Sequence, residues 1–167
     1  ALVQAGQLLG SKTSKPLYTK SSESVSVDNA ALIEINNTSL TAGAEKVLLT
    51  IRNRTTFNGI PNAIKIKLAT VDLKADGAKS VTFRVYKNSS TGGTFNYWNE
   101  TTSRLEVNTS ATLSVTTETI GTITKVINQI GSVILEKEET KRINLLDGDV
   151  IIDVKPNETI TFTAKST

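Results

Sequence analysis

Short runs of alternating apolar and polar residues constrain the fold of this 167-residue chain more than any other feature. Successive side chains of a strand point to opposite faces of a sheet, so each run predicts a strand with one buried and one solvated face. The clearest runs have apolar side chains at Ala31, Ile33 and Ile35, at Val47, Leu49 and Ile51, at Ile64, Ile66 and Leu68, and at Val81, Phe83 and Val85.

Further strands are expected toward the C-terminus, at 94–99, 103–107, 112–116, 133–137, 141–146, 150–154 and 159–164. Residues that tolerate a left-handed or fixed backbone separate the runs. They include Asn58-Gly59, Asp76-Gly77, Gly92-Gly93, Asp147-Gly148-Asp149 and Pro156-Asn157. About ten short strands joined by such turns predict an all-β fold, an antiparallel β-sandwich or jelly roll.

One segment allows two interpretations. Ile120, Ile123, Ile127 and Ile130 recur at helical spacing between residues 119 and 131. The β-branched side chains that dominate this segment favour a strand over a helix. The sequence leaves both open.

The first 22 residues differ from the rest of the chain. They carry glycines, a proline and scattered lysines, with a short apolar patch that lacks periodicity at Leu2, Val3, Leu8 and Leu9. We expect residues 1–22 to form an extended arm that a neighbouring subunit or partner orders, with a frayed terminus as the alternative. Residues 23–167 are expected to form one β-sandwich domain. The start resembles neither an intact signal peptide nor a membrane span.

The chain contains no histidine, cysteine or methionine, but 25 threonines, 15 serines and 13 asparagines. Histidine is the commonest general acid or base near neutral pH, and cysteine supplies thiolates, disulfides and metal ligands. This composition argues against most enzymes, and we expect no catalytic residue, no cofactor and no metal. A hydrolase with paired carboxylates is the weakest alternative. The acidic residues around Gly148 are Asp147, Asp149 and Asp153, and they favour a hairpin turn over a calcium site or a glycosidase pair.

Charge gives no indication of nucleic-acid binding. The net charge is +3, from 19 basic and 16 acidic residues that are interspersed along the chain. Lys65 and Lys67 share one strand face, which we interpret as a solvated face because a nucleic-acid binder usually shows a longer basic stripe.

Tyr86, Tyr97 and Trp98 are the candidate binding residues. Tyrosine and tryptophan combine a large contact area with a polar group, which suits them to stacking on sugars or anchoring a partner. The alternative is that these rings fill the core or cover a sheet edge.

Seven Asn-x-Ser/Thr triplets begin at Asn36, Asn37, Asn53, Asn88, Asn99, Asn108 and Asn157. They are acceptors for glycans in a secreted protein and only turn residues otherwise. The abundance of Asn, Ser and Thr favours the second interpretation.

Two stretches carry a resemblance to a known class of proteins. Residues 81–107 read VTFRVYKNSSTGGTFNYWNETTSRLEV, and the chain closes with LLDGDVIIDVKPNETITFTAKST. This Thr/Asn-rich texture resembles the small β-sandwich accessory proteins of tailed-bacteriophage virions, which serve as capsid decoration proteins, head fibres or tail appendages. The resemblance covers roughly a third of the chain and includes no diagnostic motif.

The resemblance implies a non-enzymatic structural protein on the surface of a virion. Its partners would be other virion proteins such as the major capsid protein, and copies of itself in a homo-oligomer, with a trimer favoured. Neither nucleic acid nor membrane is an expected partner. The alternative is a carbohydrate- or receptor-binding module of a viral or cell-surface appendage that uses Tyr86, Tyr97 and Trp98.

Overall fold

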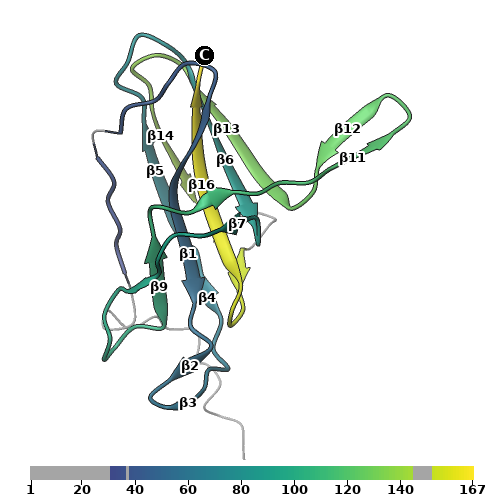
Figure 1. Cartoon of the computed structure of the whole chain (residues 1–167). Coiled ribbons are helices and arrows are strands. Elements are labelled where there is room, and N and C mark those ends of the chain that lie inside the picture. The colour runs from purple at the N-terminus through teal and green to yellow at the C-terminus, as the bar shows by residue number, and fades with distance from the viewer. Residues whose placement is uncertain (1–30, 37, 145–151) are drawn as a thin grey trace, which may run out of the picture. The chain divides into compact units, whose positions relative to one another are not determined.

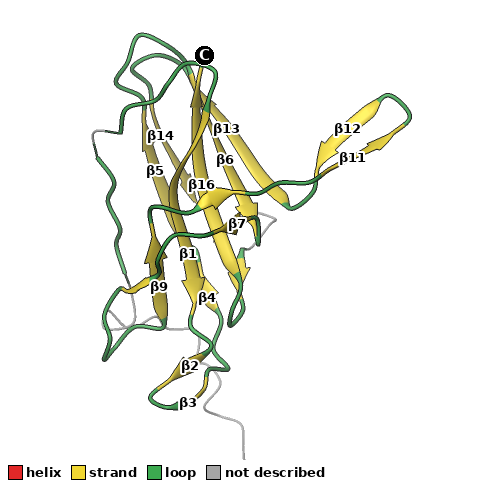
Figure 2. Ribbon diagram, viewed as in Figure 1, coloured by secondary structure: helices red, strands yellow, loops and turns green. Residues whose placement is uncertain are grey.

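A computed structural model describes residues 31–36, 38–144 and 152–167. The chain divides after Leu32, and Ile33–Thr167 forms a compact unit. Every regular element in the described part is a β-strand, which confirms the all-β class (Figure 2). The expected arm, with Leu2, Val3, Leu8 and Leu9, lies outside the described residues.

The described residues contain sixteen short strands. They are β1 (Glu45–Asn53), β2 (Thr56–Phe57), β3 (Ile60–Pro61), β4 (Ile66–Lys67), β5 (Thr70–Lys74), β6 (Val81–Lys87), β7 (Ser90–Thr91), β8 (Asn96–Tyr97), β9 (Leu105–Asn108), β10 (Thr112–Leu113), β11 (Thr117–Ile120), β12 (Ile123–Val126), β13 (Gln129–Leu135), β14 (Thr140–Asn144), β15 (Asp153–Val154) and β16 (Thr159–Ser166).

One antiparallel sheet of six strands organises this unit, in the order β13-β6-β16-β1-β9-β8 (Figure 1). The last strand, β16, lies between β1 and β6 at its centre. The remaining strands form two-stranded pairs, β2–β3, β4–β15, β5–β14, β7–β10 and β11–β12. The described strands therefore form one six-stranded antiparallel sheet with separate two-stranded ribbons, and these sheets are not closed.

The apolar core lies on one face of the six-stranded sheet. Register places Ile51 opposite both Ile160 and Val107, and Leu49 opposite Phe162. The β4–β15 ribbon packs against this face. Its contacts come from Ile152 and Val154, before and in β15, and from Ile66 and Leu68, in and after β4. Burial of such side chains contributes about 1.5–3 kcal/mol each, so the β4–β15 ribbon is held by its apolar contacts.

The opposite face of the sheet is polar, yet its centre is buried. Thr50, Thr161 and Thr163 are each 0% exposed, and Thr50 Oγ1 lies 3.0 Å from Thr161 Oγ1. The segment that carries β7 and β10 crosses this face over β1 and β16 (Figure 1). Threonine suits this position because its β-branched body fits a pleated sheet and its hydroxyl finds a partner.

Two expectations from the alternating pattern are wrong. Residues 31–36 form no strand. A bulge between Val47 and Leu49 moves Val47 to the polar face, where it lies opposite Thr163. The extra residue of a bulge shifts the alternation by one position, so Val47 and Leu49 cannot share a face.

The segment 119–131 forms strands, not a helix. Its isoleucines lie in β11, β12 and β13 and in the turn before β13. The β-branched density therefore outweighed the helical spacing. Positive φ angles confirm three expected turns. They are 53° at Asn58 and 79° at Gly59, 72° at Gly92 and 71° at Gly93, and 70° at Asn157, which follows Pro156. The turn expected at 147–149 lies outside the described residues.

Candidate functional site

The β11–β12 hairpin stands apart from the six-stranded sheet (Figure 1). Its strands pair only with each other, from Thr117 opposite Val126 to Ile120 opposite Ile123. Gly121 opens the two-residue turn with φ of 66°, a conformation that glycine adopts without steric cost. The sequence Ile-Gly-Thr-Ile thus folds locally into a tight tip with an isoleucine on each side.

Both isoleucines at this tip are exposed to solvent. Ile120 is 66% exposed and Ile123 is 71% exposed. By register they share a face of the hairpin with Glu118 and Lys125, whose Oε2 and Nζ lie 2.8 Å apart. The opposite face carries Thr119 and Thr124, joined by a 3.1 Å hydroxyl contact. The hairpin therefore has one face with an apolar tip and a base of two opposite charges.

Exposed apolar side chains concentrate around this hairpin. Of the twelve large apolar residues exposed in the described part of the chain, six lie between residues 115 and 134: Val115, Ile120, Ile123, Ile127, Ile130 and Ile134. Single exposed isoleucines are ordinary, so the informative feature is that these six residues fall within twenty consecutive positions that include the hairpin. We call Val115, Ile120, Ile123, Ile127, Ile130 and Ile134 the isoleucine surface.

The sheet edge next to the hairpin carries part of the isoleucine surface. Strand β13 pairs with β6 on one side only and is the outer strand of the six-stranded sheet. Ile134 lies on this edge and is 59% exposed. An unpaired edge presents backbone donors and acceptors to another chain.

A second group of side chains lies at the opposite edge of the sheet, where β1, β8 and β9 meet. The Cζ of Arg54 lies 3.8 Å from the ring centre of Tyr97 and 5.5 Å from that of Phe57. Arg104 Cζ lies 4.2 Å from the centre of the same Phe57 ring. Arg52 stacks on Phe95 at 3.8 Å and its Nη2 pairs with Glu106 Oε2 at 2.6 Å.

The three predicted binding residues do not form one site. Tyr86 is 2% exposed, and its hydroxyl donates a 2.7 Å hydrogen bond to Glu45 Oε2. Burial and this bond raise the pKa of Tyr86 to about 12. Tyr97 and Trp98 are 47% and 41% exposed. Tyr97 lies on β8, four strands away from Tyr86 on β6, so Tyr86 is separate from Tyr97 and Trp98.

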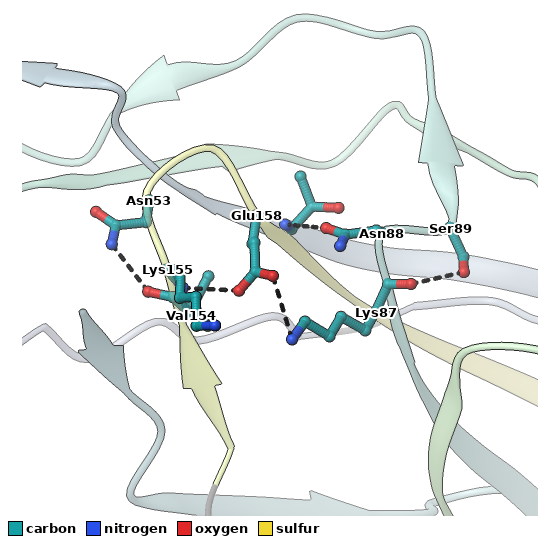
Figure 3. A network of polar contacts seen from close by, with 8 residues as sticks. Asn53, Lys87, Asn88, Ser89, Val154, Lys155 and Glu158 are labelled. Atoms are coloured by element: carbon teal, nitrogen blue, oxygen red, sulfur yellow. Dashed lines mark hydrogen bonds and ion pairs between the residues drawn. The ribbon is translucent and has the colours of Figure 1, made fainter. Parts of the chain in front are cut away.

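A polar network near the β15–β16 turn is structural (Figure 3). Glu158 accepts a 2.9 Å hydrogen bond from the Lys155 backbone N–H and pairs with Lys87 Nζ at 3.2 Å. Burial opposes the charge of Glu158, but these two contacts prevail and lower its pKa. The shallow depression beside it, of about 400 Å³, is lined by Asn88, Ser90 and residues 156–159. Within this lining, Asn88 Oδ1 accepts a 2.9 Å hydrogen bond from the Thr159 backbone N–H, so this contact joins the turn to the sheet.

The asparagine triplets serve the fold in several places. Asn53 and Asn108 are buried, at 0% and 1% exposure, so neither is accessible to a glycosyltransferase in the folded chain. Asn88 and Asn157 have positive φ, which supports their interpretation as turn residues. Within the described residues there is no group of three or more acidic side chains that could hold a metal ion. Of the acidic residues expected near Gly148, only Asp153 is described.

Sequence reasoning missed the two isoleucines at the hairpin tip and the three stacked arginines. A signal for the first was present, because Ile-Gly-Thr-Ile between threonine-rich runs is a two-residue hairpin motif. Arg52 and Arg54 alternate on a strand and so share a face. Their aromatic partners come from distant segments, and no local pattern indicates those contacts.

Comparison of the chain with protein families, with characterised proteins and with solved structures found no match. Among the described residues no helix is long and apolar enough to cross a membrane.

Proposed function

We propose that this chain is a non-enzymatic structural protein of a virion, an accessory or capsid decoration protein that associates with copies of itself through the β11–β12 hairpin. The observation that carries the proposal is the exposure of Ile120 and Ile123, 66% and 71%, at the tip of a hairpin that pairs with no other described strand. The virion setting rests on the resemblance of the two Thr/Asn-rich stretches and on the chemically inert composition.

The isolated hairpin supports a role in assembly. A two-stranded ribbon in water is marginally stable without further packing. Burying the two tip isoleucines would contribute up to about 1.5–3 kcal/mol for each. A partner surface that covers Ile120 and Ile123 would therefore stabilise the hairpin as well as the contact.

The charges on the hairpin favour a second copy of the chain as its partner. Glu118 and Lys125 lie on the same face as the tip isoleucines, with side chains 46% and 60% exposed. A face with one acid and one base is self-complementary, because each charge meets its opposite across a two-fold axis. This pattern favours a two-fold contact, whereas the expected trimer stays a prediction.

The small size of the hairpin tip favours use in many copies. A stable interface buries about 1,200 Å² or more, which two isoleucines on each side cannot supply. Weak contacts become effective when a particle repeats them. We propose that the arm, with Leu2, Val3, Leu8 and Leu9, adds a contact to the major capsid protein, and that the β4–β15 and β5–β14 ribbons act as the second layer of a β-sandwich.

The experiment is to express the full chain with Ile120→Ser and Ile123→Ser and to measure its binding to assembled particles by co-sedimentation. We expect binding to fall strongly while the thermal unfolding temperature stays unchanged, because neither side chain is buried. The matched control is Ile60→Ser with Ile64→Ser, two isoleucines that are 64% and 53% exposed elsewhere. Equal binding by both double variants would refute the hairpin contact. Deletion of residues 1–20 tests the arm in the same assay.

A second candidate function is carbohydrate or receptor binding. The observations that favour it are the exposure of Tyr97 and Trp98 and the stacking of Arg54 on Tyr97. Trp98→Ala should then weaken glycan binding without lowering thermal stability.

A further inference from the structure

Two stacked guanidinium groups lie on one surface at the edge of the sheet. Arg54 follows β1, Arg104 precedes β9, and a 2.8 Å bond from the Arg54 backbone N–H to the Arg104 carbonyl holds their backbones together. Arg54 Cζ lies 3.8 Å from the centre of the Tyr97 ring, and Arg104 Cζ lies 4.2 Å from the centre of the Phe57 ring. Arg54 Cζ is also 5.5 Å from the centre of the Phe57 ring, so the two arginines and the two rings form one cluster.

These two arginines differ from the others in their charge partners. In the described residues, Arg52, Arg84 and Arg142 each pair with a carboxylate, on Glu106, Glu45 and Asp72. Arg54 and Arg104 have no carboxylate within 4.0 Å in that same part of the chain. Glu106 is engaged by Arg52, which leaves Arg54 and Arg104 as a local excess of positive charge.

Both guanidinium groups are oriented yet keep donors available. Arg54 Nη1 donates to the carbonyls of Glu100 and Ser103, both at 3.2 Å. Arg104 Nε donates to Asn62 Oδ1 at 3.0 Å, and Asn62 is only 9% exposed. A guanidinium has five N–H donors, so most of the N–H groups of Arg54 and Arg104 have no acceptor among the described residues.

Anion recognition by arginine depends on such orientation. A planar fork that is already held in place loses little conformational entropy when it binds two oxygens of a carboxylate or sulfate. Tyr97 adds an exposed ring with a hydroxyl, a surface that can stack on the apolar face of a sugar ring and donate to its hydroxyl groups. Stacking on the rings also stabilises each guanidinium, because a cation is attracted to the face of an aromatic ring.

We propose that Arg54, Arg104 and Tyr97 form a binding site for an oligosaccharide that carries an anionic group, either carboxylate or sulfate. Arg54 and Arg104 bind the anionic group and Tyr97 binds the neighbouring sugar ring. A nucleic acid fits the site less well, because its affinity depends on neutralising several successive phosphates and only two arginines are available. The inference rests on the second candidate function, glycan binding, and is independent of assembly through the hairpin.

The only tryptophan of the chain gives a direct readout. Trp98 follows Tyr97 and is 41% exposed, so a ligand on Tyr97 changes its surroundings and its fluorescence. The full chain is titrated with a galacturonic acid trisaccharide, a sulfated galactose trisaccharide, the neutral galactose trisaccharide and a glutamate tripeptide. We expect the two anionic sugars to bind about ten-fold or more tightly than the neutral sugar, which is the effect of one charged hydrogen-bonded contact.

Two substitutions test the residues themselves. Arg104→Gln should reduce the preference for the anionic sugars to about one, and Arg104→Lys should retain part of it, because lysine keeps the charge but not the fork. Arg142→Gln is the matched control. It removes an exposed arginine that pairs with Asp72 and does not belong to the proposed site. Thermal unfolding identifies any variant that loses its fold, and Arg54→Lys then replaces it in the comparison.

The outcomes separate this inference from the function on which it rests. Tighter binding of one anionic sugar or both, lost in Arg104→Gln but not in Arg142→Gln, supports the site and identifies the anion. Equal binding of neutral and anionic sugars overturns the inference but leaves glycan binding standing. Absence of binding by every sugar overturns both. Equal binding of the glutamate tripeptide overturns the sugar and assigns the arginines to acidic peptides.

Discussion

Ile120 and Ile123 lie directly opposite each other across the Gly121-Thr122 turn, and both side chains are largely exposed. A tight turn usually ends in polar residues, so an apolar pair at this position has a cost in water that a partner would remove. The salt bridge between Glu118 and Lys125 lies two residue pairs closer to the base of the hairpin, on the same face. Together they make the hairpin tip the strongest candidate for contact between copies.

Substitution of the two adjacent glycines in the β7–β8 connection should give unequal effects. Gly92 and Gly93 have φ of 72° and 71°, so alanine costs about 1–2 kcal/mol of backbone strain at either position. At Gly93 the new Cβ would lie 2.5 Å from Oδ1 of the buried Asn108, whereas at Gly92 no atom lies within 4 Å. Overpacking adds about 1–3 kcal/mol for Gly93→Ala alone. Urea denaturation measures both, and equal losses would contradict the clash with Asn108.

The buried threonine pair on the polar face should show strong coupling. Thr50 and Thr161 are both fully buried and their hydroxyl oxygens lie 3.0 Å apart. Replacing one by valine leaves the other hydroxyl without its partner, at a cost of about 1–3 kcal/mol. Replacing both should cost clearly less than the sum of the single changes, and can be close to neutral. A double-mutant cycle by chemical denaturation measures the coupling, and additive effects would contradict a shared hydrogen bond.

Stability should fall at alkaline pH because of Tyr86. Burial, followed by the hydrogen bond to Glu45, raises the pKa of Tyr86 to about 12, whereas the phenol of the unfolded chain ionises near pH 10. Between these values the folded state holds a proton that the unfolded state has released, so the free energy of unfolding decreases as pH rises. The effect is on the order of 2 kcal/mol across this window.

Tyr86→Phe isolates this contribution. In this variant the free energy of unfolding should fall less steeply between about pH 10 and 12, because the contribution of Tyr86 is removed. Tyr97→Phe changes an exposed tyrosine and should keep the full pH dependence. Unfolding free energies from denaturation at successive pH values between about 10 and 12 measure both slopes. A slope in Tyr86→Phe as steep as in the unmodified chain would contradict the assignment to Tyr86.

The long regular strands could be predicted from the sequence, and the irregular positions could not. Val81, Phe83 and Val85 alternate cleanly in β6, as Ile160 and Phe162 do in β16. Of these, Val85, Ile160 and Phe162 pack in the apolar core as the pattern indicates. Val47 departs from the pattern because one bulge reverses the alternation. The alternation at residues 31–36 forms no strand, since pattern alone supplies no pairing partner.

The candidate site was only partly accessible from the sequence. Tyr97 and Trp98 were identified by residue type and are exposed, whereas Tyr86 is buried against Glu45. Residue type does not distinguish these cases, because tyrosine serves equally well in cores and on surfaces. The stack of Arg54 on Tyr97 joins residues from separate strands, and only the sheet order brings them together.

The most direct test of assembly through the hairpin is the solution mass of the full chain by sedimentation equilibrium over a range of concentrations. The chain has a mass of 17.9 kDa, and we predict a weight-average mass above this value that rises with concentration. The Ile120→Ser, Ile123→Ser variant should remain at the monomer mass, and the Ile60→Ser, Ile64→Ser control should behave as the unmodified chain. A monomer at every concentration, or association that is unchanged in the hairpin variant, would contradict the account.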